Sequence, residues 1–275
     1  MAVAQTIADS LLTELNRYSA EGTKPDPFTT ARLRRSIEKL SKVDHVGGLL
    51  CEAILLTFEN QYALVVDKFE EIFKFLPEDA DMHENFGNSL GRLNHMWEAQ
   101  DQYNEALRFS RDPASIIKEM AKSSCITFRI HDVMRALEQI EDPELREKLI
   151  ESQDVADALE LNTYIEEAGV TSHDVSSIYY HAERVCHEYN KSVPLGYLQL
   201  TSQFSGPNLT LYAEVDGSAT DIANMNFALC DILIDADLGT LFDKVSYVFI
   251  ADSKEKQTGE SKDKQTGTDL QHAHY

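Results

Sequence analysis

The sequence has few cysteines, few basic residues and no long apolar run. Its four cysteines stand far apart with no CxxC pair, so they signal neither a disulfide framework nor a zinc site. We expect buried free thiols at Cys51, Cys125, Cys186 and Cys230. The N-terminal residues lack the basic segment and the apolar run of an export signal, and no stretch is apolar enough to cross a membrane. These absences predict a cytoplasmic protein without a membrane partner.

Common catalytic motifs are also absent. The sequence contains no GxGxxG, P-loop, GxSxG or HExxH pattern. Histidines and a cysteine gather near residue 180, but His181 and Cys186 are five residues apart, which does not match the i, i+4 spacing of a metal site on a helix. We expect a non-enzymatic protein with no cofactor and no metal. An enzymatic C-terminal unit regulated by the rest of the chain stays open as an alternative.

Basic residues are scarce, with 25 lysines and arginines against 47 acidic residues and a formal net charge of −22. Such a charge repels phosphate backbones, so direct nucleic-acid binding is not expected. The acidic residues concentrate after residue 143. A basic run does occur within residues 32–42, and it is interpreted as the solvated face of a helix, with a nucleic-acid patch as the alternative.

The chain does contain an internal repeat of small and apolar residues. In the stretch from Ala80 to Pro113, Gly87 is followed by Ala99, Tyr103 and Ala106 at helical spacings. We call these four positions the ladder. It recurs once before this stretch, as Ala53, Val65, Phe69 and Ile72, and once after it, as Ala121, Val133, Leu137 and Ile140. The steps between the three ladders are equal. The step is a period of about 34 residues, which predicts stacked helical hairpins. Small residues in such hairpins allow two helices to approach closely.

The order of residue types closely resembles the tetratricopeptide repeat (TPR) family. The residues that match its signature are Phe86-Gly87, Leu90, Ala99, Tyr103 and Ala106. The resemblance spans residues 46–147 and implies three repeats, because the ladder fails when it is extended in either direction. It implies an α-solenoid that binds protein or peptide ligands. Family members that clamp chaperone C-termini use a lysine and an asparagine where this chain has Leu50 and Ile54, so a chaperone ligand is not implied.

The flanking segments predict helical caps and a small α+β unit. Helices are expected at residues 4–19 and from Asp26-Pro27 to Val43, forming an N-terminal cap over residues 1–45. Further helices are expected from Pro143, over residues 154–168 and over 172–190, which completes a helical solenoid at 46–190. Residues 191–252 predict a ββαβ unit, with Ser205 to Asn208 as a turn. The polar segment 253–275 predicts a disordered tail.

The first helix of each predicted hairpin lines the inner surface of the solenoid. This surface changes from apolar to polar and basic along the repeats, which favours a peptide whose apolar side chains enter one end and whose carboxylate meets the other. Solvated basic side chains without a ligand are the alternative. The predicted groove consists of Leu50, Ile54, Phe58, Asn88, Arg92, Lys118, Lys122 and Ile126.

Our leading hypothesis is therefore a protein-binding adaptor: a mainly α, TPR-like solenoid with helical caps and a small C-terminal α+β unit. The second hypothesis is an acidic inhibitor or antitoxin-like protein that neutralises a basic enzyme or mimics nucleic-acid charge. In that case Asp231, Asp235 and Asp237 would form the partner surface. The C-terminal sheet could also join two copies of the chain.

Overall fold

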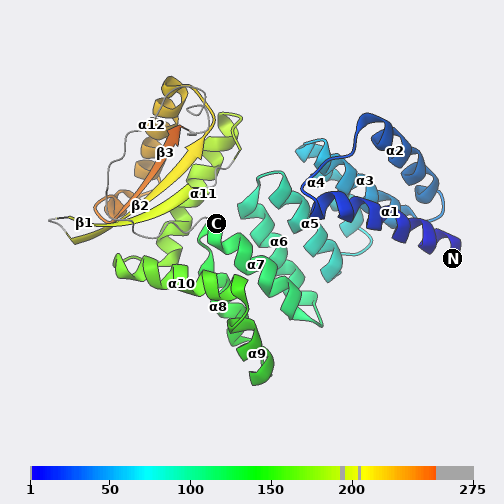
Figure 1. The fold of residues 1–275 in the computed structure, drawn as a ribbon, viewed down its shortest axis with the longest axis horizontal. Coiled ribbons are helices and arrows are strands. Elements are labelled where there is room, and N and C mark those ends of the chain that lie inside the picture. Colours follow the sequence, from blue (N-terminus) through cyan, green and yellow to red (C-terminus); the bar gives the residue numbers. More distant parts are fainter. Residues whose placement is uncertain (1, 193–195, 204–205, 252–275) are drawn as a thin grey trace, which may run out of the picture. The chain divides into compact units, whose positions relative to one another are not determined.

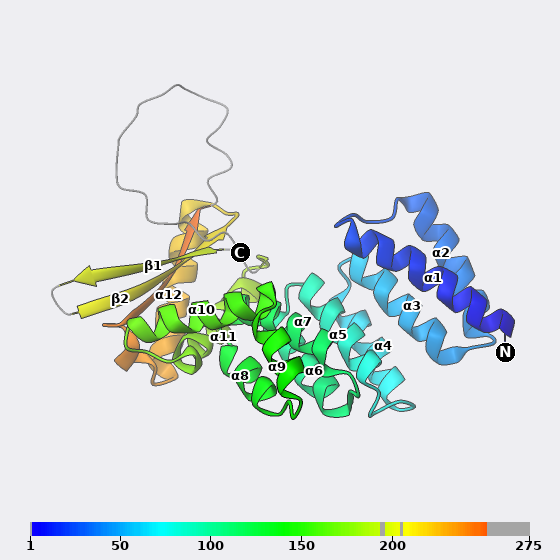
Figure 2. The ribbon, with the colours of Figure 1, turned by 60° about the horizontal axis from the view of Figure 1, so that its bottom comes forward.

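The computed structural model describes residues 2–192, 196–203 and 206–251 of the chain. The described chain is mostly helical, with a small sheet near its C-terminal end (Figures 1 and 2). It divides into two compact units, residues 1–116 and 117–275, and the division falls inside one helix. The segment boundaries that the sequence predicts between residues 45 and 46 and between residues 190 and 191 stay predictions. The predicted disordered tail at 253–275 lies outside the described residues.

The first unit begins with the two helices expected at the N-terminal end. Asp26 caps the second of them, accepting hydrogen bonds from the backbone N–H groups of Phe28 and Thr29, and Pro27 occupies its first turn as predicted. Both helices pack against the third. The helices of this unit are α1 (Ala2–Ala20), α2 (Pro27–Ser41), α3 (His45–Phe58), α4 (Tyr62–Phe73), α5 (Ala80–Arg92) and α6 (Met96–Phe109).

The helix pairs α3 with α4 and α5 with α6 form the expected hairpins, and the predicted ladder lies in their cores. Ala53, Val65, Phe69 and Ile72 are fully buried in the first pair. Ala99 and Ala106 are fully buried in the second, beside Gly87 and Tyr103. In the second unit the ladder residues Ala121 and Val133 are also fully buried, and the last one, Ile140, is half-buried. The repeat in the sequence is therefore largely a repeat of buried positions.

The turns between paired helices repeat with the same period as the core. Asn60, Asn94 and Phe128 all have left-handed backbones, with φ of 57°, 63° and 59°, and they follow one another at the same equal step as the ladder. In the first two turns, the N–H groups of Gln61 and His95 donate to carbonyls five residues earlier, those of Leu56 and Leu90, as in a Schellman cap. The backbone therefore confirms the period of the repeat.

The basic run within residues 32–42 is largely paired with carboxylates. Arg32 forms an ion pair with Glu14 of α1, and Arg34 forms one with Glu59. Lys42 lies 3.5 Å from Glu38 on its own helix. These pairs neutralise much of the basic face, which leaves less positive charge for a phosphate backbone.

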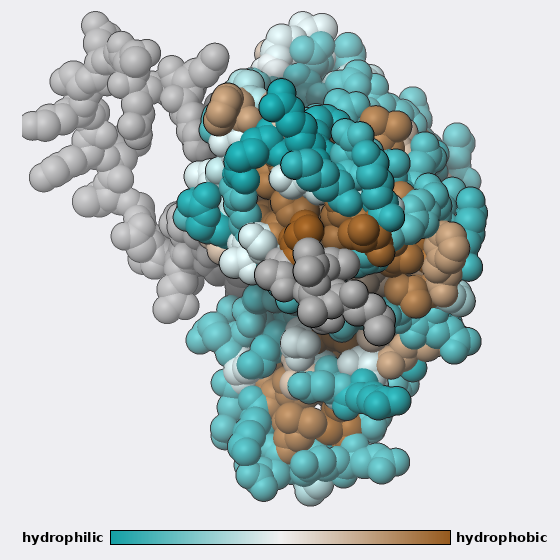
Figure 3. Space-filling view, turned by 90° about the vertical axis from the view of Figure 1, so that its right-hand side faces the viewer, coloured by the Kyte–Doolittle hydropathy of each residue, from teal (hydrophilic) through white to brown (hydrophobic). Residues whose placement is uncertain are grey.

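On the molecular face drawn in Figure 3, hydrophilic residues predominate and apolar residues gather in separate groups.

The second unit contains the remaining helices and the sheet. Thr171 and Asp174 form a capping box at the start of the helix that runs from Ser172 to Glu188. The elements are α7 (Pro113–Thr127, which begins in the first unit), α8 (Ile130–Glu138), α9 (Pro143–Ile150), α10 (Gln153–Glu167), α11 (Ser172–Glu188), α12 (Ala219–Asp235), the short 3-10 helix η1 (Gly239–Leu241), and strands β1 (Gly196–Gln203), β2 (Gly206–Val215) and β3 (Val245–Ala251).

The sheet has the order β1-β2-β3, with β1 antiparallel and β3 parallel to the central strand. The parallel pair needs a crossover, which α12 supplies. The predicted turn is wrong for residues 206–208, which pair with β1, and its first residue, Ser205, lies outside the described residues. Proline and glycine are tolerated at a strand's end, where few hydrogen bonds between the strands are lost. Four alternate residues of β2 are buried on one face: Leu209, Leu211, Ala213 and Val215.

Helices α11 and α12 pack against each other and against β3 (Figure 1). The core side of α12 consists of apolar residues, and Ile222, Met225, Leu229 and Leu233 are buried there. Asn226 of α12 also holds the edge of β3: its amide donates to the carbonyl of Phe249 and accepts from the N–H of Phe249, both at 2.9 Å. Both backbone groups of Phe249 are thus unavailable to a strand from a second copy.

Candidate functional site

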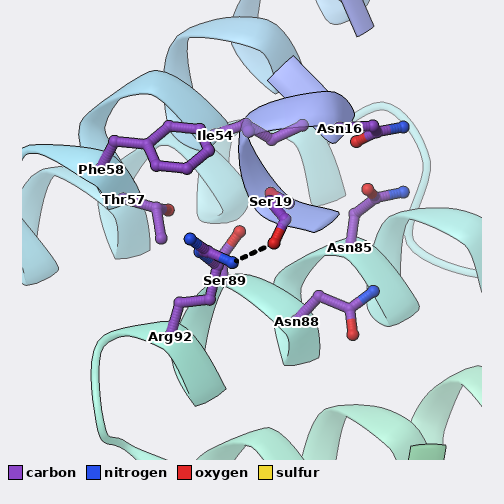
Figure 4. Close-up of a pocket in the computed structure, with 9 residues that line it drawn as sticks. All are labelled: Asn16, Ser19, Ile54, Thr57, Phe58, Asn85, Asn88, Ser89 and Arg92. Carbon is purple, nitrogen blue, oxygen red and sulfur yellow. Dashed lines mark hydrogen bonds between the residues drawn. The ribbon is translucent and has the colours of Figure 1, made fainter. Parts of the chain in front are cut away.

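A small cavity of about 230 Å³ lies within the first unit, between α1, α3 and α5. Figure 4 shows α3 side chains along one wall and α5 side chains along another, with the C-terminal part of α1 between them. The lining combines three amides, three hydroxyl side chains, two apolar side chains and one guanidinium: Asn16, Asn85, Asn88; Ser19, Thr57, Ser89; Ile54, Phe58; and Arg92.

The repeat core positions one of the amides. Tyr103 packs so closely on α5 that a Cβ atom added to Gly87 would lie 2.7 Å from its Cε1 atom. From there the Tyr103 hydroxyl donates to Oδ1 of Asn88 at 2.8 Å. The oxygen of the Asn88 amide is therefore occupied, while its NH₂ group remains able to donate into the cavity.

Arg92 lies one helical turn after Asn88 on the same face of α5. Its Nη1 donates to the backbone carbonyl of Ser19 at 3.2 Å, near the C-terminal end of α1, and its Cζ lies 4.9 Å from the centre of the Phe58 ring. Both contacts suit a cation, because carbonyls at a helix C-terminus and aromatic faces are electron-rich. Within the described residues Arg92 has no carboxylate partner, so its other N–H groups remain available.

The aromatic support of Arg92 extends into α1. Tyr18 meets Phe58 edge to face with 6.3 Å between ring centres, and Arg17 lies 4.7 Å from the centre of the Tyr18 ring. Two cations thus flank two rings. The second amide on α5, Asn85, donates to the carbonyl of Asp81 at 2.7 Å. Asn88 and Arg92 are thus two donors one turn apart on α5, a pair suited to an acceptor such as a carboxylate.

The cavity includes only some of the residues predicted from the inner surface of the repeats. Ile54, Phe58, Asn88 and Arg92 line it together. Leu50 does not line it, and it is buried within the first unit. Asn16 and Ser19 were missed, because nothing in the amphipathic pattern of residues 4–19 says which part of the solenoid that helix covers.

The other predicted groove residues belong to the second unit. Lys118 is exposed and has no ion pair within the described chain. Lys122 is exposed and 2.7 Å from Glu119, whose hydrogen bond raises the pKa of the lysine. Ile126 is half-buried. Their part in a peptide groove stays a prediction.

The three aspartates of the alternative acidic partner surface are all exposed. Asp231 and Asp235 lie on α12, and Asp237 follows its end with a left-handed backbone, φ 60°. None of them makes an ion pair within the described residues. Across 2–192, 196–203 and 206–251, no three His, Cys, Asp or Glu side chains gather as metal ligands do, and no helix combines the length and apolarity of a membrane span.

Comparison with known proteins gives little further information. No protein-family model and no curated protein matches this chain. A solved structure described as the functional characterization of Pseudomonas aeruginosa pilF aligns with 12% identity and a TM-score of 0.41, covering 86% of this chain and 89% of that chain. At such a TM-score the alignment says nothing further about the function of this chain.

Proposed function

We propose that this chain is a non-enzymatic, cytoplasmic protein-binding scaffold whose first unit takes a peptide carboxylate in the cavity between α1, α3 and α5. The observation behind this proposal is the pair of donors, Asn88 and Arg92, one turn apart on α5 in a cavity that also has apolar walls. A carboxylate can accept from both donors at once. The neighbouring side chain of the peptide would then contact Ile54 and Phe58.

The size of the cavity favours part of a peptide over a separate small molecule. Sites for drug-sized molecules usually occupy about 300–1,000 Å³, whereas this cavity has about 230 Å³. One turn of a helix, about 10–12 Å across with its side chains and 5.4 Å long, fills about 500 Å³, which is more than this cavity holds. An extended segment with one carboxylate and one apolar side chain fits these limits best.

Charge supports the same ligand chemistry. In a chain with a net charge of −22, a guanidinium without a carboxylate partner is a local attraction for an acidic group. The acidic-inhibitor hypothesis has no support from the comparisons.

An array of short synthetic peptides tests the proposal. One half carries free carboxylates, and the other half has amidated C-termini with Asn and Gln in place of Asp and Glu. The parent protein should select members of the first half, and Asn88→Leu should lose that selection. Tyr103→Phe should weaken it with little loss of fold, because only the hydroxyl that orients Asn88 is removed. Equal binding to both halves would contradict the proposal.

A further inference from the structure

The exposed face of α12 has two unlike halves. Along one half lie Ala223, Phe227, Cys230 and Ile234, all exposed and spaced at i, i+4, i+7 and i+11. Phe227 is 71% exposed and Ile234 is 57% exposed, although both are large apolar residues. They are two turns apart, which is about 10 Å along the helix axis. Such a stripe on the surface is a typical interaction feature.

Carboxylates line the other half of this face. Asp231 and Asp235 follow Phe227 by four and eight residues, so they border the apolar stripe on one side, and Asp237 extends the acidic border past the helix end. Helix α12 contains no lysine, arginine or histidine. The opposite face of α12 is already occupied by the sheet and α11, because Ile222, Met225, Leu229 and Leu233 are buried.

We propose that this α12 face, defined by Phe227, Ile234, Asp231 and Asp235, docks an amphipathic helix of another protein whose apolar stripe is bordered by lysines or arginines. The apolar residues would supply the buried contact, and the carboxylates would select and orient the basic border. This surface belongs to the second unit and does not depend on the cavity of the first.

Charge makes a second copy of this chain an unfavourable occupant. Antiparallel pairing of two α12 helices about a two-fold axis would bring both acidic borders to the same side of the contact. With no basic residue on the helix, four carboxylates would then face one another across the seam. Like charges so placed oppose association. A partner with a basic border removes this repulsion.

The test uses the full chain and a defined probe, a helical peptide of leucine and lysine with leucines at i, i+3, i+4 and i+7 and lysines along one border. A matched peptide has glutamate in place of lysine. Fluorescence anisotropy at about 0.15 M salt should show binding of the lysine peptide and none of the glutamate peptide. Phe227→Ser with Ile234→Ser should reduce affinity at least tenfold. Asp231→Asn with Asp235→Asn should reduce it several-fold and flatten its salt dependence.

Two control variants separate this surface from the general acidity of the protein. Met134→Ser with Ile150→Ser changes two other exposed apolar residues, 39% and 42% exposed, and should leave binding unchanged. Glu147→Gln with Glu151→Gln removes two exposed carboxylates elsewhere in the second unit and should do the same. Melting temperatures of all variants should match that of the parent, because every changed side chain is exposed.

Three results would overturn the proposal. The first is equal loss of binding in the test and control variants, which would mean diffuse charge attraction. The second is self-association of the parent, seen by sedimentation and abolished by the Phe227 and Ile234 changes, which would make a second copy the occupant. The third is absence of lysine-peptide binding by the parent. If binding then appears when the four lysines at 254, 256, 262 and 264 are changed to glutamine, the chain's own C-terminal segment is the occupant.

Discussion

Gly87 and Tyr103 are in such close contact that a methyl group on Gly87 would lie 2.7 Å from the tyrosine ring. Gly87→Ala should therefore push the ring away and destabilise the first unit by roughly 1–3 kcal/mol. The same helix offers a matched control, because a Cβ at Gly91 would meet only the sulfur of Met96, at 3.6 Å. Gly91→Ala should be neutral or stabilising by up to about 1 kcal/mol. Equal melting temperatures for the two variants would show that this contact is not structural.

The left-handed turns predict a second contrast. Asn60 has φ 57°, a conformation that asparagine tolerates and β-branched residues resist. Asn60→Val should cost about 1–2 kcal/mol of folding free energy, whereas Asn60→Gly should be close to neutral. Chemical denaturation of both variants measures the difference. If valine is tolerated as well as glycine, the turn geometry is not a constraint on the repeat.

Thiol reactivity should differ among the cysteines. Burial raises the pKa of Cys51, Cys125 and Cys186 to about 12 in each case, whereas Cys230 is exposed. Because the thiolate is the reactive form, a thiol-specific reagent at pH 8 should modify native protein at Cys230 well before the other three. Peptide mapping after labelling identifies the site, and Cys230→Ser should remove the fast phase. Fast labelling at Cys51 would contradict its buried position.

The second unit should lose stability in mild acid through His131. Burial lowers the pKa of His131 below its ordinary value of 6.5, with neighbouring His173, Arg129 and Arg135 acting in the same direction against Asp132. The unfolded chain therefore binds a proton more readily than the folded chain. Stability from this group is complete above about pH 6.5 and falls as the pH drops from there toward the lowered pKa.

Replacement of the titrating ring tests this pH dependence. His131→Gln should reduce the slope of melting temperature against pH below about 6.5, even if it lowers the melting temperature at pH 8. His181 has a pKa lowered by burial and by Arg184, so the variant should retain part of the slope. Parallel curves for parent and variant would mean that His131 does not titrate differently in the two states.

The sequence was most informative where a local pattern repeats. Most residues of the predicted ladder of small and apolar residues are buried in the three helix pairs, because small residues such as Gly87 are needed wherever two helices approach. Asn60 and Asn94 also repeat with this period, and the sequence analysis overlooked them as a turn signal. The third turn has Phe128 at the equivalent position, and phenylalanine is unusual in a left-handed backbone, so the sequence does not indicate a turn there.

The sequence was least informative where distant segments meet. It selected Ile54, Phe58, Asn88 and Arg92 from one face of the repeats, and these do lie together. It did not predict that Ser19 of α1 would accept from Arg92, because the path of a flanking helix is set by tertiary packing. The outward stripe on α12 was also missed, since the helix has apolar residues on both faces and its periodicity alone does not say which face is buried.

We propose that Asn88 and Arg92 together hold a carboxylate. The most direct measurement is calorimetric titration of one peptide selected from the array, in its carboxylate form and in its amidated, fully neutral form. Parent protein should bind the first about tenfold or more tightly, and Arg92→Gln should reduce that difference to near zero. The control Arg111→Gln removes another exposed arginine of the first unit and should leave the difference intact. Equal affinity of the parent for both peptide forms, or an unchanged preference in Arg92→Gln, would contradict the account.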